Sequence, residues 1–170
     1  MPLLDIVTYP DPILRRKALP VTQWDDHLQT LINDMILTMY AAPGIGLAAP
    51  QVGVSSRLFV TDISSGRRPQ DLIVLINPEI LSMEGEIEEL EGCLSVPGFQ
   101  EKISRAARVT IKGVTRRGEE IILTGEDLLA RAFQHEMDHL EGKLFFDRLG
   151  KIKRDLLKGK LRRAEGVRGR

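Results

Sequence analysis

Two histidines and a glutamate in residues 134–139, Gln-His-Glu-Met-Asp-His, could bind a metal ion and use it for hydrolysis. His135 and His139 are four residues apart, so on a helix both imidazoles project from one face and can share one ion. Glu136 lies beside them, and in a His-Glu-x-x-His segment this glutamate acts as general base. A buried, hydrogen-bonded histidine pair would give the same short pattern, so the segment alone leaves both interpretations open.

A hydrolytic metal site needs a third protein ligand and one open coordination position. The longer zinc-protease motif has a third histidine downstream, but this chain has Phe145 there, although Gly142 of that motif is present. The other protease option, a glutamate well downstream, offers only Glu165 in a basic segment. The remaining candidate is Cys93, the only cysteine, in the segment Glu-Gly-Cys-Leu-Ser-Val-Pro-Gly. We therefore favour Cys93 together with the two histidines.

The elements that must position these residues belong to a chain of ordinary domain size. A length of 170 residues allows one domain with a substantial core, and 42% hydrophobic with 28% charged residues is typical of a folded globular protein. A lone cysteine excludes an intramolecular disulfide and suits a reducing compartment. Residues 1–5 lack a signal-peptide pattern and no stretch approaches the length of a membrane span, so we expect a cytoplasmic protein with no membrane partner.

The charge is distributed unevenly along the chain. Residues 151–170 contain nine Lys or Arg and two acidic residues, a balance of +7, so residues 1–150 carry −7. A solvated terminal helix explains this segment most simply, and docking on a polyanion such as RNA is the alternative. We expect a basic C-terminal tail or helix of the same domain, with a thin apolar stripe at Ile152, Leu156 and Leu161.

The first helix is expected at residues 23–41, after a proline-rich extended arm at residues 3–21. Thr22 as N-cap and Asp25 three residues later form a capping box. Apolar residues then recur at helical spacing, at Leu28, Leu31, Ile32, Met35 and Met39. His27 lies off this stripe and is expected at the surface.

A run rich in small residues follows at 44–53, with Gln51 as its one amide side chain. The run has no following Lys-Ser/Thr and no preceding strand, which argues against a nucleotide loop. Its glycines would let the backbone of a ligand approach closely, with Gln51 as hydrogen-bond donor. A tight helix-to-strand connection is the alternative.

Five segments are expected as strands, at residues 57–61, 72–76, 84–91, 108–112 and 120–123. Asn77-Pro78 should end the second strand. The alternating glutamates of the third indicate a solvated face rather than a calcium site. The last two segments flank Arg117-Gly118 and predict an antiparallel hairpin.

The metal-binding helix is expected to open with a second capping box at residues 124–127 and to end at Gly142. Leu128 and Ala132 share a face with the two histidines. The metal site should therefore lie inside the fold, against the sheet.

Three separated segments together resemble the peptide deformylase family. They are Gly-Ile-Gly-Leu-Ala-Ala-Pro-Gln at 44–51, Glu-Gly-Cys-Leu-Ser at 91–95 and Gln-His-Glu-Met-Asp-His-Leu at 134–140. The resemblance covers residues 1 to about 150, which it identifies as the catalytic domain. It implies an α+β fold with antiparallel β-sheets around a central metal-binding helix, an N-terminal helix and a basic C-terminal helix. It also implies hydrolytic removal of the N-formyl group from the initiator methionine of newly synthesised polypeptides.

By resemblance, Cys93, His135 and His139 hold one divalent metal ion. A thiolate and two neutral imidazoles leave such an ion one net positive charge and an open position, so bound water becomes more acidic. Glu136 then takes the proton of the water and delivers it to the leaving nitrogen. The family commonly uses Fe(II), while Zn(II), Ni(II) and Co(II) also suit these ligands and the affinity order favours zinc over iron.

The resemblance also assigns residues to substrate binding. The amide of Gln51 and the backbone N–H of Leu94 would stabilise the oxyanion, each at about 3 kcal/mol. Gly46 would bond the substrate backbone, and Ile45 with the helix face near Leu128 would line an apolar pocket for the methionine side chain.

The chain also departs from the family pattern. Arg131 stands where some members have an aliphatic residue near the pocket, and Gln100 where others have an arginine that contacts the substrate backbone. Asp138 lies between the histidines, and we expect it to support the site by pairing with Arg105; a solvent-facing aspartate is the alternative.

Other functions remain open for this sequence. The basic tail resembles C-terminal helices by which bacterial deformylases dock near the ribosomal exit tunnel. A metallopeptidase or another amidase could use the same Cys-His-His site, without a formyl group in its substrate. A metal or redox sensor would use a closed site in which Glu136 has no role, and an RNA-binding module would need no metal.

Overall fold

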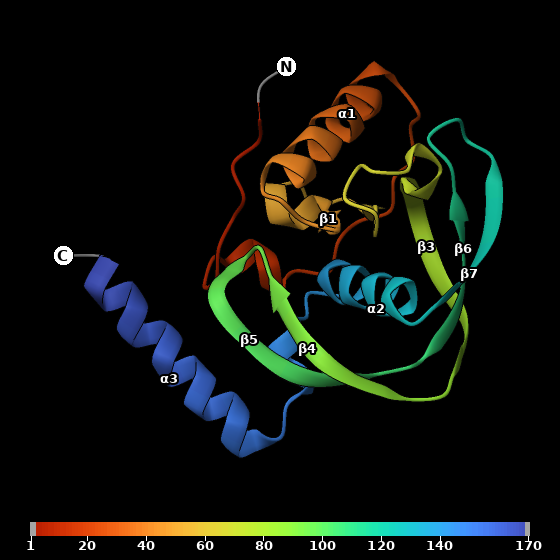
Figure 1. Cartoon of the computed structure of the whole chain (residues 1–170). Coiled ribbons are helices and arrows are strands. Elements are labelled where there is room, and N and C mark those ends of the chain that lie inside the picture. Colours follow the sequence, from red (N-terminus) through yellow and green to blue (C-terminus); the bar gives the residue numbers. More distant parts are fainter. Residues whose placement is uncertain (1–2, 169–170) are drawn as a thin grey trace.

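The helix that carries His135 and His139 lies at the centre of the molecule, as expected (Figure 1). The computed structural model describes the backbone of residues 3–168 and the side chains of residues 3–164. A five-stranded sheet has the order β1-β2-β3-β6-β7, and β4 and β5 form a separate two-stranded sheet. All pairs are antiparallel. Helix α2 runs between the two sheets, so the expected α+β architecture is confirmed.

The elements follow one another with short connections. The helices are α1 (Asp26–Ala41), α2 (Leu128–Leu140) and α3 (Lys151–Arg168). The strands are β1 (Gly46–Ala48), β2 (Leu58–Thr61), β3 (Ile73–Glu84), β4 (Ile87–Cys93), β5 (Val96–Arg105), β6 (Arg108–Val114) and β7 (Glu120–Glu126). Short 3-10 helices lie at Pro12–Arg15, Ala49–Val52, Pro69–Asp71 and Phe145–Arg148.

Helix α1 begins three residues later than the sequence predicts. Asp25 is its N-cap, and the Asp25 carboxylate accepts a hydrogen bond from the Leu28 N–H at 3.0 Å. The predicted cap at Thr22 is wrong because the residues around it are held elsewhere: Val21 N–H donates to the Asn77 side chain, and the Trp24 indole donates to the Thr115 carbonyl. The predicted stripe is buried except for Leu31, which is half-buried, and His27 is exposed.

Strand β3 continues past Asn77-Pro78, where the sequence predicts its end. The pairing of β3 with β6 changes register between Ile76 and Glu79. This shift marks a bulge at Asn77 and Pro78. A bulge accommodates both the missing N–H of Pro78 and the left-handed backbone of Asn77 (φ 50°). The strand therefore reaches Glu84.

The predicted capping box at residues 124–127 is also wrong. Residues up to Glu126 belong to β7, where Thr124 pairs with Thr110 and Glu126 with Arg108. Helix α2 starts only after Asp127, whose φ of 52° turns the chain from strand to helix without a side-chain cap. The antiparallel hairpin of β6 and β7 is confirmed.

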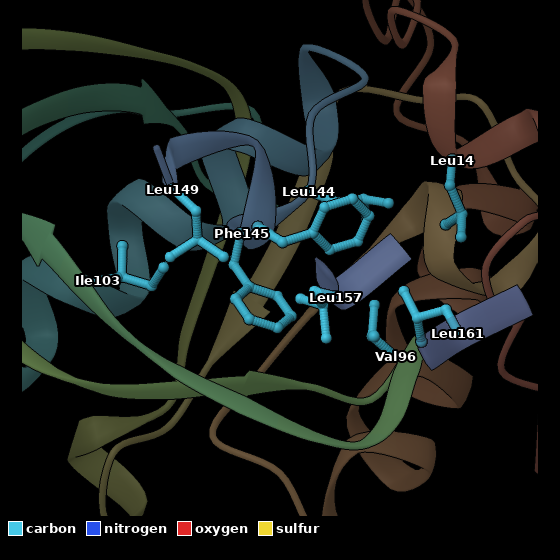
Figure 2. Close-up of a cluster of buried hydrophobic side chains, with 9 residues drawn as sticks. Leu14, Val96, Ile103, Leu144, Phe145, Leu149, Leu157 and Leu161 are labelled. Carbon is cyan, nitrogen blue, oxygen red and sulfur yellow. The ribbon is translucent and has the colours of Figure 1, made fainter. Parts of the chain in front are cut away.

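Helix α3 packs on the body of the molecule through two leucines. Leu157 and Leu161 join a buried cluster with Leu14, Val96 and Phe145 (Figure 2). The expected stripe is right only for Leu161, because Ile152 and Leu156 are 78% and 61% exposed. The side chain of Glu165 lies outside the described residues. Among residues 3–168, no helix has both the length and the apolar character needed to cross a bilayer.

Candidate metal centre

Cys93, His135 and His139 converge although 42 residues separate the cysteine from the first histidine. The Cys93 sulfur lies 3.3 Å from Nε2 of His139, and the two histidine Nε2 atoms are also 3.3 Å apart. All three potential ligand atoms lie within 4.8 Å of one another. In a tetrahedral site with metal–nitrogen distances of about 2.0–2.1 Å, two imidazole nitrogens are roughly 3.3 Å apart. The donor atoms therefore fit a single divalent ion.

The local fold explains how these side chains meet. Cys93 ends strand β4, and the register shift after Gly92 pairs it with Val96 across a tight turn. His135 and His139 are one helical turn apart on α2, and His139 contacts Cys93 at the end of β4. Strand end and helix face are therefore brought together by tertiary packing.

The surroundings of the Cys93 thiol lower its pKa. Burial alone would raise its pKa, but the imidazoles of His139 and His135 lower the pKa of Cys93 to about 5. At neutral pH the sulfur is thus a thiolate, which is the form that binds metal ions.

Glu91 orients the first histidine, a role that the sequence does not predict. It was expected on a solvated strand face, but it is only 7% exposed. Its carboxylate lies 2.7 Å from Nδ1 of His135 and accepts hydrogen bonds from Arg105 and Arg131. Burial favours the neutral acid, but hydrogen bonds from His135 and Arg105 hold the pKa of Glu91 well below its usual value. In a neutral His135, Nδ1–H would donate to Glu91, and Nε2 would then carry the lone pair that a metal ion needs.

Asp138 is buried and ion-paired rather than facing solvent. It accepts a hydrogen bond from Arg105 at 2.7 Å, the contact that the sequence suggests. Arg148 adds two bonds at 2.8 and 2.6 Å, a contact that the sequence does not predict. Burial would raise the pKa of Asp138, but the bonds from Arg148 and Arg105 lower it.

Glu136 lies beside the three ligands with a polar atom left free. The side chain is 3% exposed, and Oε1 has no hydrogen-bond partner among the described residues. Burial raises the pKa of Glu136 to about 7, against the opposing effect of His135 and His139. A Cβ added at Gly46 would collide with this carboxylate, so the glycine permits the close approach of β1 to α2. A buried carboxyl with a pKa near neutrality can both accept and deliver a proton.

Gln51 points its amide towards the same place. Its Oε1 accepts from the Ala48 N–H at 3.0 Å, which turns Nε2 towards the Ser95 hydroxyl at 3.1 Å and the Cys93 sulfur at 3.6 Å. The small-residue run around it contains β1 and the 3-10 helix Ala49–Val52, with Gly53 as C-cap, so it is more than a tight connection. It places an N–H donor beside the candidate ligands.

A cavity of about 170 Å³ opens beside His135 and Glu136. Its lining includes Ile45, Gly46, Leu94, Leu128 and Arg131. Leu128 is 46% exposed and so lies at the edge of the cavity rather than in the interior. A second, more open hollow of about 750 Å³ is lined by Cys93, Leu94, Phe99 and Gln100, among others. Gly92 and Leu94 line both spaces.

Comparisons with known proteins agree on one family. The family model described as "Polypeptide deformylase" matches residues 3–155. A peptide deformylase of Acidobacterium capsulatum is 50% identical over 165 residues, covering 97% of each chain. One of Thermodesulfovibrio yellowstonii is 52% identical over 162 residues, covering 95% of this chain and 98% of the relative. The crystal structure of a peptide deformylase from Legionella pneumophila superposes with a TM-score of 0.91, at 49% identity and 99% coverage of both chains.

Proposed function

Since the chain belongs to the polypeptide deformylase family, we propose that Cys93, His135 and His139 hold its metal ion and that Glu136 moves the proton during hydrolysis. As a member, the chain is a hydrolase that removes the N-formyl group from the initiator N-formylmethionine of new polypeptides. The observation that carries the assignment of residues is the convergence of one sulfur and two imidazole nitrogens beside an unpaired, buried carboxylate oxygen.

A divalent ion bound by these residues would acidify a water molecule and polarise the formyl carbonyl. The thiolate and the two imidazoles suit Fe(II), Zn(II), Ni(II) and Co(II), and the affinity order favours zinc over iron. We propose Fe(II) as the ion used in the cell, in line with the family resemblance, because metal supply rather than affinity decides the occupant there.

Glu136 is proposed to accept a proton from the attacking water and to return it to the departing nitrogen. Its free Oε1 and its pKa near neutrality support both steps. The amide N–H of Gln51 and the backbone N–H of Leu94 are proposed to stabilise the developing negative charge on the formyl oxygen. The hydrogen bond from Ala48 fixes the amide of Gln51 before substrate arrives, and such preorganisation gives an oxyanion donor its effect.

The methionine side chain is proposed to enter the cavity of about 170 Å³. Ile45 and Leu128 would supply apolar wall, and Gly46 would hydrogen-bond to the substrate backbone where β1 passes Glu136. The cavity adjoins His135 and Glu136, so a methionine held there leaves its formyl group at the metal ligands.

Gln51→Leu is expected to lower kcat by about 10²–10³-fold, because one oxyanion donor is lost. Steady-state kinetics on formyl-Met-Ala-Ser would measure the change, with thermal denaturation as a check that the fold is retained. Gln29→Leu is the matched control, since Gln29 bonds Arg116 away from the site. A kcat within about threefold of the unaltered enzyme would remove Gln51 from the oxyanion site.

Residues 1–150 are proposed as the catalytic domain, and residues 151–170 as a basic tail that contacts the ribosome in the cytoplasm. Exposed cations on α3, including Lys151, Lys153 and Lys160, support an electrostatic contact with RNA. Because Leu157 and Leu161 are buried against the body, deletion of the whole tail would also disturb the core.

Replacing Lys151, Lys153 and Lys160 together by glutamine is therefore the cleaner test of docking. Co-sedimentation with ribosomes at low salt should weaken. The slope of log affinity against log salt concentration should also become shallower, by roughly the contribution of three phosphate contacts. Hydrolysis of a short formyl peptide should not change. The same triple substitution at three exposed lysines of the body, Lys102, Lys112 and Lys143, is the control. Equal co-sedimentation of the two triple variants would reject docking through the tail.

The reaction itself is tested by offering matched peptides to the metal-loaded enzyme. Formyl-Met-Ala-Ser should release formate and a free amino terminus, while acetyl-Met-Ala-Ser and unformylated Met-Ala-Ser should remain intact. Cleavage of an internal bond in the unformylated peptide would instead support a metallopeptidase.

A further inference from the structure

The strand pair that carries Cys93 is not part of the main sheet. Strands β4 and β5 pair only with each other, whereas the other five strands form one sheet. A lone two-stranded hairpin is marginally stable in water, so its position depends on what it packs against. Figure 1 shows this hairpin curving beneath α2, which carries the two histidines. Val96 and Ile103 of the hairpin are buried against Phe145 and its apolar neighbours. Polar contacts with α2 add a second anchor, beside the sulfur and the imidazoles.

Arg131 makes such contacts from the helix side. It lies one turn before His135, on the same face of α2, and is 5% exposed. Its guanidinium donates to Glu91 Oε1 at 2.8 Å, to the Ile103 carbonyl at 2.9 Å and to the Ile87 carbonyl at 3.4 Å. The two carbonyls belong to opposite strands of the hairpin, and Glu91 lies between Ile87 and Cys93 on β4. One planar guanidinium group thus forms hydrogen bonds to both strands of the hairpin.

Arg105 makes the reciprocal contact from the hairpin side. It extends from the end of β5 to Asp138 on α2 at 2.7 Å, and it also donates twice to Glu91. Glu91 therefore accepts from one arginine of each element and from His135. Every member of this group except His135 is less than 9% exposed, so removal of one arginine would leave an incompletely paired buried charge.

We propose that Arg131 is a positioning residue that clamps the β4–β5 hairpin to α2 and so keeps the Cys93 sulfur within reach of His135 and His139. This inference rests on the proposed metal site. Because Arg131 also lines the 170 Å³ cavity, its loss is expected to change KM as well. Metal retention, rather than KM, therefore distinguishes the positioning of the ligands from the lining of the cavity.

The test measures how fast the Co(II)-loaded protein loses its ion to excess chelator at 25 °C without denaturant. Arg131→Met is expected to lose cobalt about 10- to 100-fold faster than the unaltered protein, the usual effect of removing a partner behind a ligand. Arg131→Lys keeps the charge but can reach fewer of the three acceptors. Its rate of cobalt loss should therefore lie between those of Arg131→Met and the unaltered protein. Arg108→Met is the matched control, because Arg108 forms an exposed ion pair with Glu126 across β6 and β7.

Three readouts keep the outcomes distinct. A sulfur-to-cobalt absorption band in the unaltered protein establishes the Cys93 ligand, and its absence would refute the proposed site rather than the clamp. With that band present, an unchanged rate of cobalt loss in Arg131→Met, or in Arg131→Lys if the former does not fold, overturns the inference. A lower urea midpoint of the metal-free variant with an unchanged rate of cobalt loss would likewise assign Arg131 to global stability alone.

Discussion

Glu136→Ala is expected to retain the metal ion while losing nearly all turnover. General acid–base catalysis contributes about 10²–10⁴-fold, and here one carboxylate is proposed to serve both proton transfers. The side chain is not among the three proposed ligands, and Oε1 makes no hydrogen bond to the described residues, so its removal should leave the ligands in place. Metal content by elemental analysis and kcat on a formyl-methionyl peptide measure the two effects separately.

Glu141→Ala is the control for this substitution. Glu141 follows α2 and pairs with Arg57 and Lys17, away from the cavity. It should keep both metal and kcat. Turnover by Glu136→Ala at the level of Glu141→Ala would contradict the proposed role of Glu136. Such a result would mean that a group other than Glu136 transfers the proton during hydrolysis.

Cys93→Ala is expected to lose both the metal ion and the activity. Two imidazoles alone are a poor site for a divalent ion, because the sulfur supplies the negative charge as well as the third ligand. Its low pKa, about 5, means that the ligand is already ionised at neutral pH. Metal content after dialysis and kcat after anaerobic reloading would measure the loss.

Ser95→Ala is a suitable control for Cys93→Ala. Ser95 lies two residues further along and accepts a hydrogen bond from Gln51, but it is not among the three proposed ligands. It should retain its metal. Full metal content in Cys93→Ala would contradict the ligand set.

The site was predictable from the sequence where its geometry is local. Histidines four residues apart must share a helix face, and Glu136 must lie next to them. Cys93 could be proposed because it is the sole cysteine, a third ligand was needed, and its segment resembles the family pattern. The structure brings all of these side chains to one place.

The supporting charges were not predictable in the same way. Glu91 was expected in solvent because neighbouring glutamates alternate along its strand. It is instead buried, and its carboxylate is hydrogen-bonded to Arg105, Arg131 and His135, which are distant in the sequence. Arg148 lies beyond the end of α2, and nothing in its local sequence marks it as a partner of Asp138. Ion pairs between separate elements depend on how the elements pack, and the local sequence pattern does not predict that packing.

Element boundaries failed for a related reason. The residues at 124–127 and at Thr22 have the composition of helix caps, but tertiary partners hold them outside the helices. Strand β3 passes through Pro78 because a bulge removes the need for its N–H. In each case pairing with a distant segment outweighed a local preference.

X-ray absorption at the metal edge of the anaerobically loaded protein tests the central claim most directly. We expect one sulfur at about 2.3 Å and two imidazole nitrogens at about 2.0–2.1 Å, with one further light atom completing the shell. The sulfur contribution should disappear in Cys93→Ser. A shell of nitrogen and oxygen alone in the unaltered protein would contradict the account.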